Sequence, residues 1–224
     1  MLARTRACWA PGLFALAVLS GCAPASKEAP EAGAAPMTPE APTPTPAPEA
    51  ATELAPEVAL AETFIDAFYA FDREAMAALV KDAGDAGNRI LWYQGWAEGG
   101  NYAIVKRGAC EMLEPGVVEC PITVDDDPVL ALKTGFKVTD TFTLTIADGR
   151  ITDIKTRSND QPIYYEARKW VEANHPELIE GPCAERGTAG GTPGDCARAM
   201  TEGYRRFAAS PDYTGPNITS DEGA

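Results

Sequence analysis

The sequence is poor in the residues and motifs on which most enzyme sites depend. It holds a single histidine, His175, and no Cys-x-x-Cys pair, so its residues do not favour a zinc site. The metalloprotease, serine-hydrolase, P-loop and dinucleotide-binding motifs are also missing. We therefore expect neither a metal ion nor a cofactor, and no motif selects a reaction.

Positive charge is scarce as well. Lys and Arg number 19 against 33 Asp and Glu, which gives a formal net charge of −14. Nucleic-acid binding and adhesion to anionic lipid through basic patches both need a positively charged surface. The composition therefore argues against both. The acidic run Asp125-Asp126-Asp127 lacks the glycine and the distal glutamate of a calcium loop, and it predicts a solvated turn before Pro128.

The apolar run Leu13–Leu19 is too short for a permanent membrane-spanning helix. It follows Arg4 and Arg6 and precedes small residues, which predicts a cleaved signal peptide over residues 1–21. Leu19-Ser20-Gly21-Cys22 resembles the bacterial lipobox, which implies acylation (palmitate) of Cys22 and a lipid anchor in the membrane of the cell envelope. By resemblance to Gram-negative sorting rules, Ala23 favours the outer membrane. The alternative is ordinary cleavage that leaves Cys22 as a free thiol.

Residues 22–56 form a Pro/Ala-rich segment that cannot build a core. Nine of the 19 prolines lie within it, and such a composition favours an extended, disordered tether. The folded domain is expected over residues 57–213, followed by a flexible tail over 214–224. Four cysteines lie in this domain, in an exported and oxidising setting. Sequence proximity favours the disulfides Cys110–Cys120 and Cys183–Cys196 among three pairings.

Apolar periodicity predicts an α+β domain in which helices come first, then antiparallel strands, then helices. The predicted helices cover residues 57–71, 73–81 after an Asp72 cap, about 89–98 after a break at Gly84–Gly87, a segment capped by Asp160 that ends before His175, and a last segment from Thr192 through Phe207. The predicted strands cover residues 118–124, 136–146 and 150–158.

Two bulges are expected in the hairpins. A plain two-residue turn at Pro115-Gly116 would set Cys110 opposite Pro121, so a disulfide to Cys120 needs an odd loop or a bulge. The spacing of Ile151 and Ile154 suggests a second bulge near Thr152-Asp153, which brings Ser158 opposite Asp140.

The chain has three features that together resemble a known family: the helix Phe64–Tyr69, the second helix led by Asp72, and the long strands that meet at Asp148-Gly149. That family is the nuclear-transport-factor-2-like superfamily, which includes the SnoaL-like cyclases and the ketosteroid isomerases. The resemblance covers about residues 57–174. It implies a cone-shaped, curved antiparallel sheet packed around the N-terminal helices, with an apolar pocket in its mouth, and the disulfide-linked C-terminal helix is an addition. Dimerisation through the outer face of the sheet is common in that family.

One residue interrupts an otherwise apolar strand face. Asp140 lies among Phe136, Val138, Phe142 and Leu144 on alternating positions, where burial would raise the pKa of its carboxyl. The ketosteroid isomerases use cavity carboxylates in this way, so Asp140 is the one candidate catalytic residue. The alternatives are a bulge that turns it outward, or structural hydrogen bonds from Ser158, Tyr102 or an indole. The candidate pocket residues are Phe64, Phe68, Trp92, Tyr93, Trp96, Phe142 and Trp170.

Two functions stay open from the sequence. The first is an envelope-anchored module that binds a small hydrophobic ligand or a protein partner without catalysis. The second is an isomerase, cyclase or hydratase that uses Asp140 as general base. We favour the first, and the geometry of the pocket decides between them.

Overall fold

The computed structural model describes residues 54–184 and 191–215. Its helices are α1 (Pro56–Tyr69), α2 (Arg73–Leu79), α3 (Gly84–Gly99), α4 (Asp127–Ala131), α5 (Pro162–Asn174), α6 (Pro176–Ile179) and α7 (Pro193–Ala209). Its strands are β1 (Ala103–Arg107), β2 (Glu111–Glu114), β3 (Val117–Asp125), β4 (Val138–Ala147) and β5 (Arg150–Ser158). The predicted signal peptide, Cys22, most of the Pro/Ala-rich segment and most of the tail lie outside these residues.

α1 forms because its apolar residues recur at helical spacing. Ala61, Phe64, Ile65 and Phe68 are fully buried on one face. Pro56 stands in the first turn, where its missing N–H leaves no intrahelical bond unmade. The chain then turns, and the Asp72 side chain accepts a hydrogen bond from the Ala75 N–H at 2.9 Å. This bond confirms the predicted cap of α2.

α3 begins at Gly84 rather than at residue 89, so the predicted break at Gly84–Gly87 is wrong. Gly84 starts the helix with a φ of +54°, which glycine adopts without strain. Gly87 lies inside the helix, and a Cβ there would approach the Val80 carbonyl oxygen to 2.6 Å. Gly87 therefore permits close packing of α3 against the end of α2, and Gly84 permits the turn at which α3 begins.

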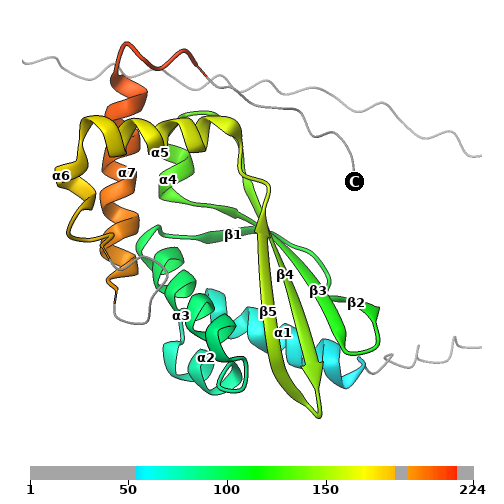
Figure 1. Ribbon diagram of the computed structural model, residues 1–224. Coiled ribbons are helices and arrows are strands. Elements are labelled where there is room, and N and C mark those ends of the chain that lie inside the picture. Colours follow the sequence, from blue (N-terminus) through cyan, green and yellow to red (C-terminus); the bar gives the residue numbers. More distant parts are fainter. Residues whose placement is uncertain (1–53, 185–190, 216–224) are drawn as a thin grey trace, which may run out of the picture. The chain divides into compact units, whose positions relative to one another are not determined.

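The strands form one antiparallel sheet of five strands in the order β1-β3-β4-β5, and β2 also pairs with β3. α1 lies across one face of this sheet (Figure 1). The buried residues of β3 and β4 alternate with partly exposed ones and face α1. Phe142 of β4 meets Phe64 and Phe68 of α1, with ring centroids 5.7 and 5.0 Å apart. This aromatic contact forms the centre of the main core.

Both predicted bulges are present. In the first hairpin, Met112 pairs with Val118 but Glu114 pairs with Val117, so one extra residue lies between the two pairs. In the second, the register shifts between Thr145 and Ile146, opposite the predicted bulge site in β5. Ser158 accordingly pairs with Asp140, as the sequence predicts. Each bulge increases the local twist of its hairpin.

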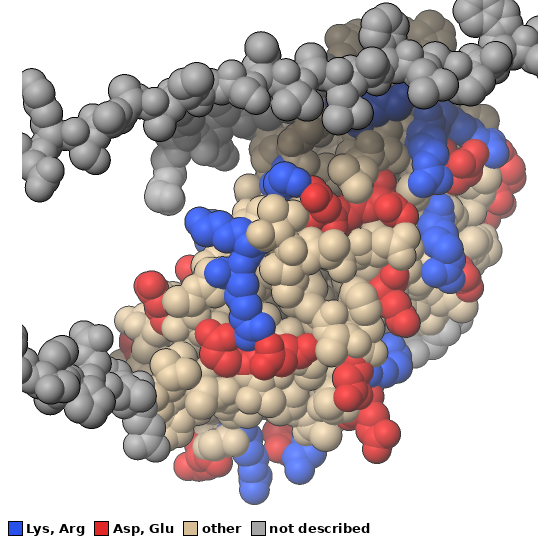
Figure 2. Space-filling view, turned by 180° about the vertical axis from the view of Figure 1, so that it is seen from behind, with Lys and Arg blue, Asp and Glu red and all other residues tan. Residues whose placement is uncertain are grey.

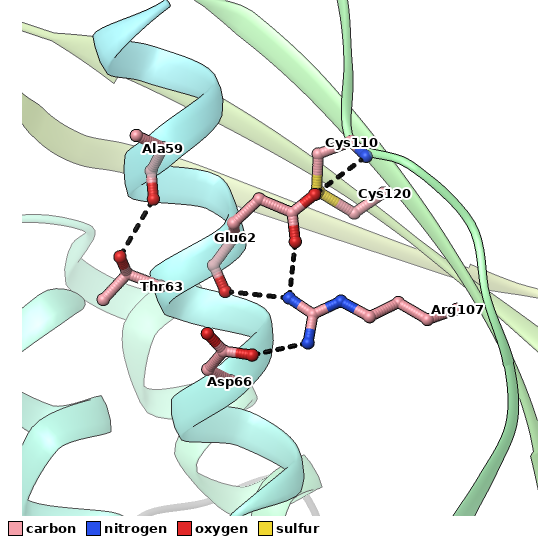
Figure 3. The surroundings of a disulfide bond; sticks show 7 residues. All are labelled: Ala59, Glu62, Thr63, Asp66, Arg107, Cys110 and Cys120. Atoms are coloured by element: carbon pink, nitrogen blue, oxygen red, sulfur yellow. Dashed lines mark hydrogen bonds and ion pairs between the residues drawn. A yellow bond between two sulfur atoms is a disulfide. The ribbon is translucent and has the colours of Figure 1, made fainter. Parts of the chain in front are cut away.

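The first disulfide links the two sides of the β2–β3 hairpin, next to α1. Cys110 and Cys120 are bonded and buried, which confirms the predicted pair. Figure 3 shows how α1 binds the same region: Glu62 accepts from the Cys110 backbone N–H and binds the Arg107 guanidinium, which also binds Asp66 at 2.5 Å. The disulfide therefore closes the hairpin, while the Glu62 hydrogen bond and the Arg107 ion pairs hold the segment before it against α1.

α5, α6 and α7 form a second helical layer beside α4 (Figure 1). The second predicted disulfide, Cys183–Cys196, is present and links the segment after α6 to the first turn of α7. Two predicted caps are wrong. Gln161 rather than Asp160 is the residue that precedes α5, and it makes no capping hydrogen bond. Thr192 does precede α7, but its hydroxyl donates to the Pro182 carbonyl oxygen at 3.1 Å instead of capping the helix.

The observed architecture confirms an α+β domain with an antiparallel sheet and two disulfides. Within the described residues, none of the helices combines the length and the apolar character that crossing a membrane requires. On the face shown in Figure 2, acidic and basic side chains lie interspersed around uncharged surface.

Candidate ligand-binding site

Asp140 points into the protein, as the sequence predicts. Its side chain is 1% exposed, on the same face of β4 as Val138 and Phe142. The Ser158 hydroxyl donates to its Oδ1 at 2.5 Å, and the Tyr69 hydroxyl donates to its Oδ2 at 3.4 Å. Both carboxylate oxygens thus have a hydrogen-bond partner. Of the structural alternatives considered from the sequence, the Ser158 bond is the one that the structure contains.

The environment of Asp140 favours the neutral acid. Burial raises the pKa of its carboxyl, and the hydrogen bonds from Ser158 and from two tyrosines offset only part of that rise. The tyrosines are Tyr69 and Tyr93, and burial raises the pKa of both phenols. They therefore stay protonated and act as donors to the carboxylate across the physiological range of pH.

A cavity of about 260 Å³ lies next to this network. α3 and the loop after it, the end of β5, and α5 supply its walls. The lining includes six aromatic side chains: Trp92, Trp96, Tyr93, Tyr102, Tyr164 and Tyr165. Its polar lining consists of Thr156, Ser158, Asp160 and Arg168. We call this the aromatic cavity.

Asp140 lies behind the wall of the aromatic cavity. Ser158 and Tyr93 line the cavity, and both interact with the Asp140 carboxyl. Asp140 itself does not line it. A molecule in the cavity could therefore touch Ser158 directly and reach Asp140 only through that hydroxyl or through Tyr93.

The predicted pocket residues divide into three groups. Trp92, Tyr93 and Trp96 line the aromatic cavity. Phe64, Phe68 and Phe142 are fully buried in the main core and line no open space there, so their assignment to a pocket is corrected. The assignment of Trp170 to the pocket is also corrected. Its ring packs against Phe207 at 5.6 Å, and its indole N–H donates to Asp212 at 2.8 Å, away from the cavity.

The contribution of α5 to the site was not predicted from the sequence. Tyr164, Tyr165 and Arg168 lie within one turn of that helix and face the cavity together with Asp160. Their spacing was the available signal, because positions i, i+1 and i+4 share one side of a helix. The apolar residues Ile163, Ala167 and Val171 mark only the neighbouring, buried side of the helix, so the cavity-facing side was not recognised.

Asp126 was also misjudged, because the predicted solvated turn is the start of α4. The Asp126 side chain is 1% exposed, and its Oδ1 accepts from the Val129 N–H at 2.9 Å. Its Oδ2 is buried with no hydrogen-bond partner among the described residues. Burial raises the pKa of this carboxyl from 3.8 to about 7, and the charge of Asp140 adds to the rise.

A third carboxyl, Asp160, completes an acidic cluster beside the aromatic rings. Burial raises its pKa, and a hydrogen bond from the Tyr165 hydroxyl at 3.3 Å lowers it in part. The negative charge of Asp160 raises the pKa of Asp126 and of Asp140. We call Asp126, Asp140 and Asp160 the carboxyl cluster. None of the three forms an ion pair with a lysine or arginine within residues 54–184 and 191–215.

The described residues hold no group of three or more His, Cys, Asp or Glu side chains arranged to bind a metal ion. His175 lies between α5 and α6, where its ring is 3.1 Å from Glu177. Comparisons of the chain with protein-family models, with curated proteins and with solved structures find no match. The site must therefore be interpreted from its own geometry.

Proposed function

We propose that this protein is an envelope-anchored lipoprotein whose folded domain binds a small, largely apolar molecule without transforming it. The observation that carries the proposal is the aromatic cavity of about 260 Å³, with six aromatic side chains in its wall. Apolar concave sites with a few convergent polar groups are the usual form of a small-molecule site. A nuclear-transport-factor-2-like cone is part of the same proposal, supported by the helix-then-sheet order and the two bulges.

The polar lining supports a ligand with a defined orientation. Ser158, Asp160 and Arg168 come from the end of β5, the residues after it and α5, whereas both tryptophans come from α3. A molecule in the cavity would therefore place an apolar body against Trp92 and Trp96 and a polar group toward β5. The burial of Asp140 supports binding over catalysis, since the carboxylate already has a partner at each oxygen.

The test is binding of a neutral apolar fluorophore, N-phenylnaphthylamine, to the full-length protein in detergent. We expect its emission to rise on binding and to fall when Trp92→Ala removes one wall of the cavity. Trp170→Ala is the matched control, because this tryptophan lies away from the cavity. Equal binding by all three proteins would show that the fluorophore binds elsewhere and would refute the cavity as the site.

A second candidate function is catalysis that uses Asp140 through Ser158. One observation favours it: the Ser158 hydroxyl lines the cavity and lies 2.5 Å from Asp140 Oδ1, so the carboxylate could accept a proton through that hydroxyl. A carboxyl with a raised pKa suits general acid–base chemistry near neutral pH. The Asp140→Asn variant, discussed below, separates this candidate from binding alone.

A further inference from the structure

We infer that the aromatic cavity binds an organic cation, a small alkylated ammonium compound, held by ring faces and by the carboxyl cluster. This inference rests on the proposed function, because it names the chemical class of the ligand for the same cavity. It follows from three features of the described residues: the arrangement of the rings, the uncompensated carboxyls, and the state of the one arginine in the wall.

The aromatic rings line the cavity as three neighbouring pairs. Trp92 and Trp96 stack with centroids 5.7 Å apart and planes 24° from parallel. Tyr93 and Tyr102 meet edge to face at 6.2 Å and 90°. Tyr164 and Tyr165 do so at 6.0 Å and 88°. Rings set at right angles present faces in different directions, and the negative faces of several rings around one space attract an alkylated ammonium group.

The carboxyl cluster supplies the acidic groups of this space, and burial disfavours their ionised form. Asp160 lies in the wall, Asp140 lies behind Ser158 and Tyr93, and Asp126 acts on the phenols of Tyr102 and Tyr164. As described above, none of these carboxyls has a basic partner in the ion pairs of the described residues. A cation in the cavity would stabilise the ionised carboxyls that burial disfavours, whereas an anion would disfavour them further.

Arg168 does not reverse this argument. It is the one basic side chain that lines the aromatic cavity among the described residues, and its Nε donates to Glu172 Oε1 at 3.0 Å on the same helix. Its charge is therefore already compensated by a carboxylate outside the cavity wall. Its pairing leaves the carboxyl cluster as the unmatched charge of the site.

A second cavity is suited to an anionic ligand instead of a cation. It has a volume of about 270 Å³, shares Tyr93 and Thr156 with the aromatic cavity, and adds Arg89 and Lys155. Neither of these two basic residues forms an ion pair with another residue in the part of the chain that the structure describes. An anionic ligand would bind there, and Arg89 therefore supplies the control variant.

The experiment compares three probes of similar shape and different charge on the full-length protein in detergent by titration calorimetry. The probes are choline, its uncharged analogue 3,3-dimethylbutan-1-ol, and the anion 3,3-dimethylbutanoate. We expect choline to bind at least about tenfold more tightly than the alcohol. Asp160→Asn should remove most of that difference, and Arg89→Gln should leave it unchanged. Circular dichroism of both variants confirms that each remains folded.

Three outcomes overturn the inference and leave the proposed function standing. Binding of the alcohol as tight as that of choline would show that charge is not recognised. Binding of 3,3-dimethylbutanoate that is tighter than that of choline, and that Arg89→Gln does not weaken, would show that the aromatic cavity prefers an anion. If choline fails to bind while N-phenylnaphthylamine still binds in a Trp92-dependent way, the assignment of a cation as the ligand is also refuted. If N-phenylnaphthylamine also fails to bind in a Trp92-dependent way, the proposed function itself is refuted.

Discussion

At the scale of single residues, Asp140 shows how a polar interruption of an apolar strand can be interpreted. Its inward position follows from the period of two in β4, which the sequence displays. Its hydrogen bond to Ser158 follows from the register of the second hairpin, which depends on the bulge. Its contacts with Tyr69 and Tyr93 do not follow from the sequence, because they depend on how α1 and α3 pack against the sheet.

We expect Asp140→Asn to fold and to be more stable than the wild type at pH 8, by roughly 1 kcal/mol. The raised pKa of Asp140 means that its charged form is disfavoured in the folded state, so stability is lost as the pH rises above the ordinary value of 3.8. Urea unfolding at pH 4 and pH 8 measures this, and the gain should be smaller at pH 4, because lower pH favours the protonated carboxyl that burial also favours.

The same variant separates the two candidate functions. Under binding alone, Asp140→Asn retains the affinity for N-phenylnaphthylamine, because the carboxyl lies behind the wall. Under catalysis, it loses turnover of any substrate that the wild type converts while binding persists. A variant less stable at pH 8 than the wild type would contradict the first expectation, since it would mean that the carboxylate gains more from its hydrogen bonds than it loses by burial.

Asp126 leads to a prediction about pH dependence. The unfolded chain releases this proton near 3.8 and the folded chain near 7, so between these values the folded state binds more protons. The free energy of unfolding therefore falls as the pH rises through this window. Since a tenfold change in proton affinity corresponds to ~1.4 kcal/mol, this group contributes up to ~4 kcal/mol to the fall.

Asp126→Asn should flatten that part of the pH profile. Asparagine can accept from the Val129 N–H in the same way, so the cap of α4 is retained. Denaturation of the wild type and the variant at pH 4, 5, 6, 7 and 8 gives the two profiles. Parallel profiles would show that Asp126 titrates near its ordinary pKa and that burial does not affect it.

At the scale of helices and strands, glycine was the main source of error in the sequence analysis. Gly84 and Gly87 were interpreted as a helix break, because only local conformation can be judged from sequence. Their role depends on a neighbour, since Gly87 lies against the Val80 carbonyl. The strands were predicted more closely, because alternation and turn residues are local signals and the disulfide required the first bulge.

The packing of α3 against α7 supplies a test at this scale. A Cβ at Gly99 would lie 2.3 Å from the Cα of Gly194 at the start of α7, where backbone cannot move aside cheaply. We expect Gly99→Ala to reduce the free energy of unfolding by ~1–3 kcal/mol, even though alanine favours helix. Gly181→Ala is the control, since nothing lies within 4 Å of its Cβ position.

Urea unfolding of both alanine variants measures the difference. The control should stay within ~0.5 kcal/mol of the wild type. If Gly99→Ala is as stable as Gly181→Ala, then α3 and α7 can separate without loss, and their close contact does not contribute to the stability of the fold. In that case the position of the cavity wall on α3 would not depend on α7.

At the scale of the whole molecule, the sequence predicted the class of the domain but only part of its site. The coarse order of helices, then strands, then helices follows from local periodicity and is confirmed, but β1, α6 and the short helix α4 between β3 and β4 were not predicted. The aromatic cavity joins α3, β5 and α5, which are far apart in the chain, so its lining could not be assembled without the fold. Trp92, Tyr93 and Trp96 were found because they lie together on one helix.

The last prediction concerns how the domain is held at the membrane. If Cys22 is acylated, the protein fractionates with membranes, since two or three acyl chains at ~0.8 kcal/mol per buried CH₂ make a stable anchor. We expect Cys22→Ser to release it into the soluble fraction of the envelope, with N-phenylnaphthylamine binding unchanged because the aromatic cavity is built entirely from residues 92–168. Cys8→Ser is the control, because Cys8 lies within the predicted signal peptide and is removed with it. Membrane retention of the Cys22→Ser variant would refute the lipid anchor, and it would indicate that another part of the chain holds the domain at the membrane.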